Sequence, residues 1–291
     1  CWIVTAIAEL VAITGYVQFW WAAVPLWLPT VLVVLIVFLL NAVSVKNFGE
    51  MEFWFALIKI VAILALIVVG AIMALTHFAS PDGHTAQLAN LWNDGGWFPN
   101  GAMGVVAGFQ IAVFAFVGIE LVGTTAAEAR DPRTTLPRAI NSVPVRILIF
   151  YVGSLLAILV VTPWRSINPE QSPFVAMFAL AGLAGAASVV NFVVLTSAMS
   201  SSNSGVFSTS RMMFGLSAEG SAPGIFKGLN RVGVPVRALY LTAGILLLTI
   251  PVLYAGDSII EAFTLITSVA SLLFVFVWSM ICLLYTSDAA D

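Results

Sequence analysis

Charged residues are scarce in this sequence: Asp, Glu, Lys and Arg make up 9% of its 291 residues, and the net charge is −3. Hydrophobic residues make up 61%, and the mean hydropathy is +1.06. A soluble domain of this length needs a polar surface, so the composition excludes one and predicts an all-α polytopic membrane protein. The cations form no basic stripe, so the expected partner is a lipid bilayer and not nucleic acid.

Cysteines and catalytic motifs are also few or absent. The two cysteines, Cys1 and Cys282, lie in apolar segments and indicate neither a disulfide framework nor a structural metal site. The sequence contains no phosphate-binding GxxxxGK[ST] loop, no HExxH and no GxSxG. The serine-rich segment 200–210 has no His or paired base near it in the sequence. An enzyme, a metal or an organic cofactor is therefore not expected.

Long apolar runs dominate what is present. A helix that crosses a bilayer needs about 20 apolar residues. The Ala- and Gly-rich segment 174–186 is predicted to be a short outer helix or a re-entrant segment, because the uncharged stretch 171–210 is too long for one span. The predicted spans are 1–21, 29–46, 53–75, 102–124, 144–163, 188–211, 236–255 and 259–284.

The cations are distributed unevenly between the loops on the two sides of these spans. One set of loops holds nine of the eleven Lys and Arg, and the other set holds Arg165 alone. Positively charged loops stay in the cytoplasm, so loop 125–143 is predicted to be cytoplasmic and loop 76–101 extracytoplasmic. The nine cytoplasmic cations are Lys46, Arg130, Arg133, Arg138, Arg146, Arg211, Lys227, Arg231 and Arg237.

The segment 114–131, FAFVGIELVGTTAAEARD, places a carboxylate inside an apolar span. Glu120 follows Phe114 and Phe116 and lies between Gly118 and Gly123. An intramembrane carboxylate is costly and usually marks a site, although it can also serve as a structural hydrogen-bond anchor. Glycines allow a helix to unwind, which is tolerated at membrane depth where the backbone lines a cavity. The pattern is typical of a discontinuous transporter helix that binds its substrate at the break.

Three polar features fall at one predicted depth. Lys59, Ser204 and Glu120 each lie seven or eight residues from a charged cytoplasmic end, which is about 10–12 Å along a helix. A lysine at this depth needs a partner or loses its charge, and Ser200 to Ser204 offer polar groups. The alternatives are that Lys59 extends to the interface and that the serines serve close helix packing. Glu9 has no assignable partner.

Several long segments resemble the bacterial amino acid permeases of the amino acid–polyamine–organocation superfamily. They are FAFVGIELVGTTAAEARDP followed by LPRAINSVPVRILIFY, VKNFGEMEFWFALIKIVAI at 45–63, NFVVLTSAMSSSNSGVFSTSRMMFGL at 191–216, and LWNDGGWFPNG at 91–101. The resemblance covers nearly the whole chain up to about Leu284. It lies within the group that includes aromatic amino acid and γ-aminobutyrate permeases.

The resemblance implies a fold of twelve helices with two inverted five-helix repeats and discontinuous helices. Residues 1–284 would then form a permease domain that runs from the third to the tenth helix, with 102–124 as the broken sixth helix. We expect the chain to be a fragment that lacks the first broken helix, and residues 285–291 depart from the family pattern.

The resemblance also implies roles for individual residues. Phe114 would be an aromatic gate, and the backbone of Ala115 and Val117 would face the substrate amino group. Apart from the resemblance, the two bulky rings of Phe114 and Phe116 are expected to narrow the site. Gly118 and Ile119 would form the unwound turn, which Glu120 would brace. Lys59 would couple transport to protons and would face the eighth helix, whose residues Ser200, Asn203 and Ser204 complete the predicted set.

The implied function is proton-coupled import of small neutral amino acids, such as D-alanine, D-serine and glycine, across the bacterial cytoplasmic membrane. The proton gradient, and no bound cofactor, would drive it. One alternative is an aromatic or other amino acid permease of the same group. Another is an amino acid sensor or channel-like protein that uses the same pocket without coupled transport.

Overall fold

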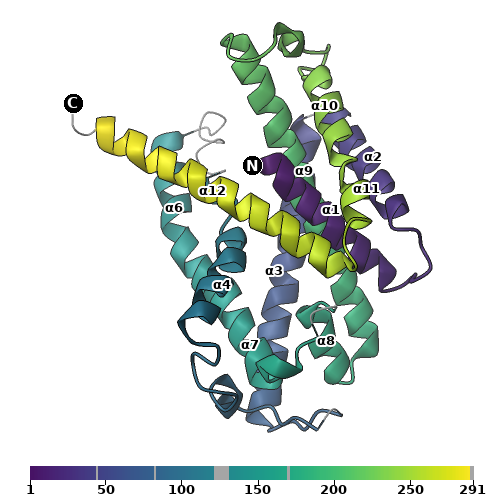
Figure 1. The fold of residues 1–291 in the computed structure, drawn as a ribbon, viewed down its shortest axis with the longest axis vertical. Coiled ribbons are helices and arrows are strands. Elements are labelled where there is room, and N and C mark those ends of the chain that lie inside the picture. Colours follow the sequence, from purple (N-terminus) through teal and green to yellow (C-terminus); the bar gives the residue numbers. More distant parts are fainter. Residues whose placement is uncertain (44, 82, 121–130, 169–170, 289–291) are drawn as a thin grey trace. The chain divides into compact units, whose positions relative to one another are not determined.

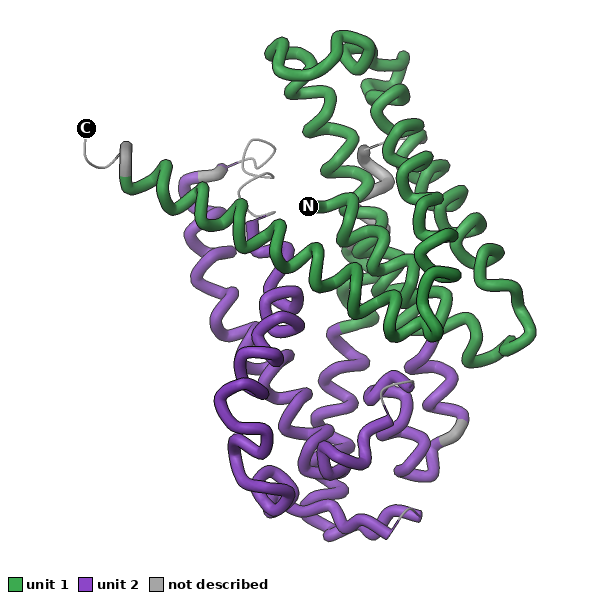
Figure 2. Tube along the Cα trace, viewed as in Figure 1, with its two compact units in different colours: residues 1–59, 192–291 green, residues 60–191 purple. Residues whose placement is uncertain are grey.

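The computed structural model describes residues 1–43, 45–81, 83–120, 131–168 and 171–288. Within these ranges every element is a helix, and one isolated β-bridge joins Ala79 to Thr85 (Figure 1). The chain divides into two compact units (Figure 2). The first contains residues 1–59 and 192–291, and the second contains residues 60–191.

Each predicted span contains helical structure, although in the span 102–124 the helix ends at Ala115 and residues 121–124 lie outside the described residues. Helical stretches that are long and apolar enough to cross a membrane are Phe53–Leu75, Arg133–Val161, Gly185–Ala218, Val236–Leu253 and Ile259–Thr286. The α-helices are α1 (Trp2–Gln18), α2 (Trp27–Val43), α3 (Val45–Leu75), α4 (Gly101–Ala115), α6 (Pro132–Ile147), α7 (Gly153–Val161), α8 (Pro173–Leu180), α9 (Ala184–Ala218), α10 (Val236–Leu246), α11 (Thr249–Leu253) and α12 (Ile259–Asp288). The shorter turns are η1 (Leu88–Leu91), η3 (Leu148–Val152), η4 (Trp164–Ser166) and η5 (Gly224–Lys227).

Several predicted boundaries were wrong. The segment before residue 144 is helical from Pro132, because proline suits the first helical turn and Thr134 donates a hydrogen bond to Asp131 Oδ2 at 2.8 Å. The span 236–255 is interrupted after Leu246. Pro251 explains the interruption, since its ring clashes with the carbonyl four residues earlier and it has no N–H to donate.

The uncharged stretch 171–210 forms two helices. The short helix α8 lies in the Ala- and Gly-rich segment, as predicted, and Gly182 with φ of +77° makes the turn that follows it. Helix α9 begins four residues before the predicted span and continues past Arg211 to Ala218. The Arg211 guanidinium lies 3.3 Å from the centroid of the Phe207 ring, so the helix accommodates this cation on its own surface.

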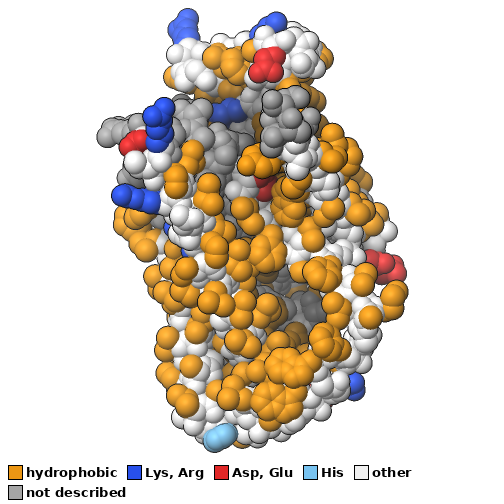
Figure 3. Space-filling model, turned by 90° about the vertical axis from the view of Figure 1, so that its left-hand side faces the viewer, with side chains coloured by type: hydrophobic (Ala, Val, Ile, Leu, Met, Phe, Trp, Pro, Cys, Tyr) orange, Lys and Arg blue, Asp and Glu red, His pale blue; other side chains and the backbone are white. Residues whose placement is uncertain are grey.

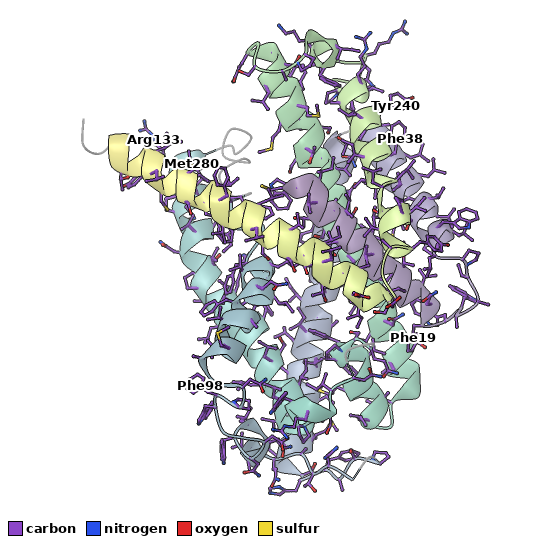
Figure 4. The ribbon with its side chains drawn as sticks, viewed as in Figure 1. Phe19, Phe38, Phe98, Arg133, Tyr240 and Met280 are labelled. Atoms are coloured by element: carbon purple, nitrogen blue, oxygen red, sulfur yellow. The ribbon has the colours of Figure 1, made fainter. Side chains whose placement is uncertain are left out.

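The core of the first unit forms around α1, which packs against α2, α10, α11 and α12. Gly205 favours the close approach of α9 to α1, since a Cβ there would lie 3.2 Å from the Trp2 carbonyl oxygen, a tight contact. The rings of Phe38 and Tyr240, on α2 and α10, lie 4.9 Å apart (Figure 4). The core residues are Ala6, Ile7, Leu10, Ile13, Val33, Val34, Val37, Ala198, Val206, Val234, Leu239 and Leu246.

The second unit is stabilised by a close contact between α3 and α7 and by hydrogen bonds from the loop between α3 and α4 to the end of α7. A Cβ on Gly70 of α3 would lie 2.8 Å from the Ala157 Cβ of α7, so these helices meet where only glycine fits. The Asn90 side chain donates hydrogen bonds to the carbonyls of Val160 at 2.8 Å and Thr85 at 2.9 Å. These bonds attach the loop between α3 and α4 to the end of α7.

Large hydrophobic side chains are exposed over much of the face drawn in Figure 3. On α3, Val68, Ile72 and Leu75 follow one another at helical spacing and are 56%, 55% and 83% exposed. A soluble protein seldom exposes so much contiguous apolar surface. The exposed surface is the one that a lipid bilayer would cover.

Candidate substrate turn and polar cluster

The helix that carries the predicted break ends at Ala115, three residues before Gly118. The N–H of Phe116 donates to the Val113 carbonyl at 3.1 Å, and that of Val117 to the Phe114 carbonyl at 3.1 Å. These bonds close tight turns in place of regular α-helical ones. The unwinding therefore begins at Phe116, earlier than the turn predicted at Gly118 and Ile119.

Gly118 adopts a backbone conformation that favours glycine, and its N–H binds the Glu120 side chain. Gly118 has φ of +109°, a conformation that a residue with a Cβ adopts only at a cost in strain. Its N–H donates to Glu120 Oε2 at 3.3 Å. Within the described residues the other carboxyl oxygen, Oε1, is buried and has no hydrogen-bond partner. Gly123, the second predicted glycine, lies outside the described residues.

The end of α4 has an electrostatic consequence. This 15-residue helix directs its carbonyl groups toward Ala115, and the carbonyl end of a helix carries a partial negative charge. An apolar segment offers little water to satisfy those oxygens. The turn is thus suited to a cationic group that donates hydrogen bonds, such as the ammonium group of an amino acid.

Tyr151 is a contact of this turn that the sequence analysis missed. Its hydroxyl donates to the Ala115 carbonyl at 2.7 Å, and its ring lies edge-on to Phe116 with centroids 5.6 Å apart. It comes from η3, a π-helical turn between α6 and α7. A tyrosine in an apolar run is normally read as an interface anchor, so the sequence carries no specific signal for this contact.

A polar cluster lies in the first unit. The Glu9 carboxyl group of α1 accepts a hydrogen bond from the Ser201 hydroxyl of α9. Lys59 of α3 interacts electrostatically with the same carboxyl group. The sequence alone predicts no partner for Glu9, and Ser201 is not among the predicted coupling residues. The structure therefore assigns Lys59 an acidic neighbour in addition to the predicted serine-rich helix.

The other predicted coupling residues have different contacts. Asn203 Oδ1 accepts a hydrogen bond from Asn41 Nδ2 of α2 at 2.7 Å, and both side chains are buried. The Ser204 hydroxyl donates to the Ser200 carbonyl of its own helix at 3.1 Å. Asn41 was detectable in sequence as the amide that follows the apolar run of α2, but its partner was not.

The residues of the described ranges bring no three His, Cys, Asp or Glu side chains together as ligands for a metal ion. The cluster around Glu9 consists of its carboxyl group, the Ser201 hydroxyl and Lys59.

Comparisons with known proteins agree with this architecture. The chain matches the model of the family described as "Amino acid permease" over residues 1–287. It is 59% identical over 281 residues to the "D-serine/D-alanine/glycine transporter" of Escherichia coli K12, which covers 97% of this chain and 60% of that protein. It is 49% identical over 280 residues to the "Amino-acid permease AapA" of Bacillus subtilis, covering 96% and 60%.

A third relative is the "DL-alanine permease SerP2" of Lactococcus lactis, at 43% identity over 282 residues, which cover 96% of this chain and 61% of that protein. The chain thus spans about three fifths of the length of the relatives that it matches. The match along nearly all of this sequence confirms the resemblance drawn from its motifs. The protein belongs to the amino acid permease family.

Proposed function

We propose that this chain forms the central part of a multi-pass transporter that imports small neutral amino acids across the bacterial cytoplasmic membrane. D-alanine, D-serine and glycine are the proposed substrates, and a proton gradient is the proposed driving force. The observation that carries the proposal is the end of α4 at Ala115 inside an apolar segment, followed by the Gly118 turn and Glu120. The names of the relatives support the substrate class.

The turn accounts for recognition of the substrate ammonium. The carbonyl end of α4 attracts a positive charge, and the buried Oε1 of Glu120 is a further acceptor. Phe114 and Phe116 flank the turn and restrict the side chain of the substrate, while Val117 and Ile119 complete its backbone. In transporters with inverted repeats, a second broken helix contributes to the site. The N-terminus of its half-helix carries a partial positive charge and can bind the substrate carboxylate.

The cluster of the first unit is the proposed coupling site. Lys59 would bind and release the transported proton, and Glu9 would balance the charge of its protonated form. Ser201 holds Glu9 in place through its hydroxyl, and Asn203 fixes α9 against α2. Ser200 and Ser204 lie on the same helix, α9. A carrier of this kind moves protons and substrate and needs no catalytic group.

Uptake by a completed carrier tests the proposal. A chimera would take its remaining segments from the Escherichia coli D-serine/D-alanine/glycine transporter and would be reconstituted in vesicles with an inward proton gradient. We expect saturable accumulation of labelled D-alanine that collapses with a protonophore. Binding without accumulation would favour a sensor. Tryptophan carried as well as alanine would favour an aromatic permease.

The coupling residues are tested in the same vesicles. Lys59→Ala should lose accumulation against a gradient and retain substrate binding, because the proton carrier is removed and the turn is not. Glu9→Gln should alter the pH dependence of accumulation, since it removes the opposing charge. Ser279→Ala is the matched control, because Ser279 is exposed and its hydroxyl binds its own helix at Val275. Accumulation by Lys59→Ala with an unchanged pH profile would refute the coupling role.

A further inference from the structure

The helix that carries Tyr151 has a local irregularity at that position. Residues Leu148–Val152 form a π-helical turn between α6 and α7. The Ser154 hydroxyl donates to the carbonyls of Phe150 and Tyr151, the second at 3.1 Å, and Ser154 is buried. A π-turn widens the helix and frees carbonyls, and such turns are frequent at functional sites. Here the Ser154 hydroxyl binds the carbonyls of Phe150 and Tyr151, so a side chain of the same helix stabilises the π-helical turn.

Among the described residues, the Tyr151 side chain contacts the end of the broken helix in two ways. The hydroxyl binds the carbonyl of Ala115, the last residue of α4, and the ring contacts Phe116, the first residue after it. The two residues are consecutive at the point where the helix unwinds. One side chain therefore holds both the terminal carbonyl and the aromatic ring that follows it.

We propose that Tyr151 is a positioning residue that sets both the ammonium contact and the size limit of the substrate turn. This inference rests on the proposed function and deepens it. A carbonyl oxygen has two lone pairs, so the tyrosine hydroxyl occupies one at Ala115 and leaves the other to a substrate ammonium. Its edge-on contact keeps the Phe116 ring beside the site, where the ring excludes large side chains.

Two variants of Tyr151 test its hydrogen bond and its ring contact separately. Tyr151→Phe keeps the ring and removes the hydroxyl, so the KM for glycine and D-alanine should rise about two- to tenfold, the value of one hydrogen bond. The maximal rate and the preference for small substrates should not change. Tyr151→Ala also removes the ring contact, and it should in addition carry amino acids with larger side chains, such as leucine.

The experiment is uptake by the chimera in proteoliposomes, with rates expressed per amount of inserted protein. The matched control is Tyr240→Phe, which also removes a hydroxyl from an exposed tyrosine with an aromatic neighbour, Phe38. A second measurement does not depend on transport. With both native cysteines replaced by serine, a cysteine at Val117 should react faster with a thiol reagent in Tyr151→Phe, because the turn is less constrained.

The outcomes distinguish the two proposals. If the chimera with Tyr151 takes up no amino acid, the proposed function fails. If it takes up D-alanine and Tyr151→Phe has the same KM and the same thiol reactivity, the positioning role is overturned. A fall in maximal rate with unchanged KM would also overturn it, because that result indicates a purely structural residue.

Discussion

The buried amide pair between α2 and α9 allows a quantitative test of how the first unit is held together. Asn41 Nδ2 donates to Asn203 Oδ1 at 2.7 Å and to the Val37 carbonyl at 2.9 Å, while Asn41 Oδ1 is buried without a partner among the described residues. The perturbation is a double-mutant cycle made of Asn41→Ala, Asn203→Ala and the combination of the two.

The contacts set the expected sizes. Asn203→Ala leaves one N–H of the buried Asn41 side chain without an acceptor. It should lower the unfolding free energy by about 1–3 kcal/mol, the penalty for a buried unpaired polar group. Asn41→Ala strands Asn203 Oδ1 but also removes the unpartnered Asn41 Oδ1, so it should cost less. In the double variant neither partner remains. The interaction energy should be about 0.6 kcal/mol and at most about 1.7 kcal/mol, the range for hydrogen bonds between membrane helices.

The assay is equilibrium unfolding in mixed detergent micelles, followed by tryptophan fluorescence, for all four proteins under one condition. The cycle cancels the loss of packing at each site, because each substitution occurs with and without its partner. An interaction energy near zero would refute the claim that the two amides bind each other. A larger cost for Asn41→Ala than for Asn203→Ala would refute the role given to the unpartnered oxygen.

Three further predictions concern orientation, packing and substrate size. In a cysteine-free version, a single cysteine at Leu88 should react with an impermeant thiol reagent in intact cells and one at Thr134 should not, and the reverse would overturn the topology. Gly70→Val should destabilise the second unit by about 1–3 kcal/mol in a detergent melt, because a Cβ there meets a neighbouring helix at 2.8 Å. Gly244→Ala should leave the unfolding free energy unchanged or raise it, because a Cβ at that position would meet no atom within 4 Å. Phe114→Ala should admit larger amino acids in competition uptake, and unchanged selectivity would remove its gate role.

Most of the helices could be predicted from sequence, and their ends could not. A run of about 20 apolar residues is a strong signal because the bilayer core has a fixed thickness. The ends depend on local chemistry that the run does not show. Pro132 begins α6 inside a segment predicted as a loop, and Pro251, the third residue of α11, disfavours a regular helix across the junction between α10 and α11 inside a predicted single span. A break near Gly118 was predictable, because a carboxylate inside an apolar helix is costly and the glycine beside it allows the backbone to unwind.

The candidate site was only partly visible in the sequence. Lys59 and Glu120 stood out because charge at membrane depth is costly. Asn203 was noted as polar, yet its assignment to coupling missed its bond with Asn41. Tyr151 gave no signal at all, since a tyrosine in an apolar run resembles many interface anchors.

By itself, the sequence determined that this protein is a helical membrane protein, which segments form its apolar helices, and that one of them is interrupted near Gly118. These properties depend on the cost of placing polar groups in lipid, which each segment carries alone. Only the tertiary structure decided which polar groups meet. Tyr151 binds a carbonyl 36 residues away, and Asn41 binds an amide 162 residues away. Such pairs depend on which helix faces pack together, and a hydrogen bond across that distance leaves no periodic trace in either segment.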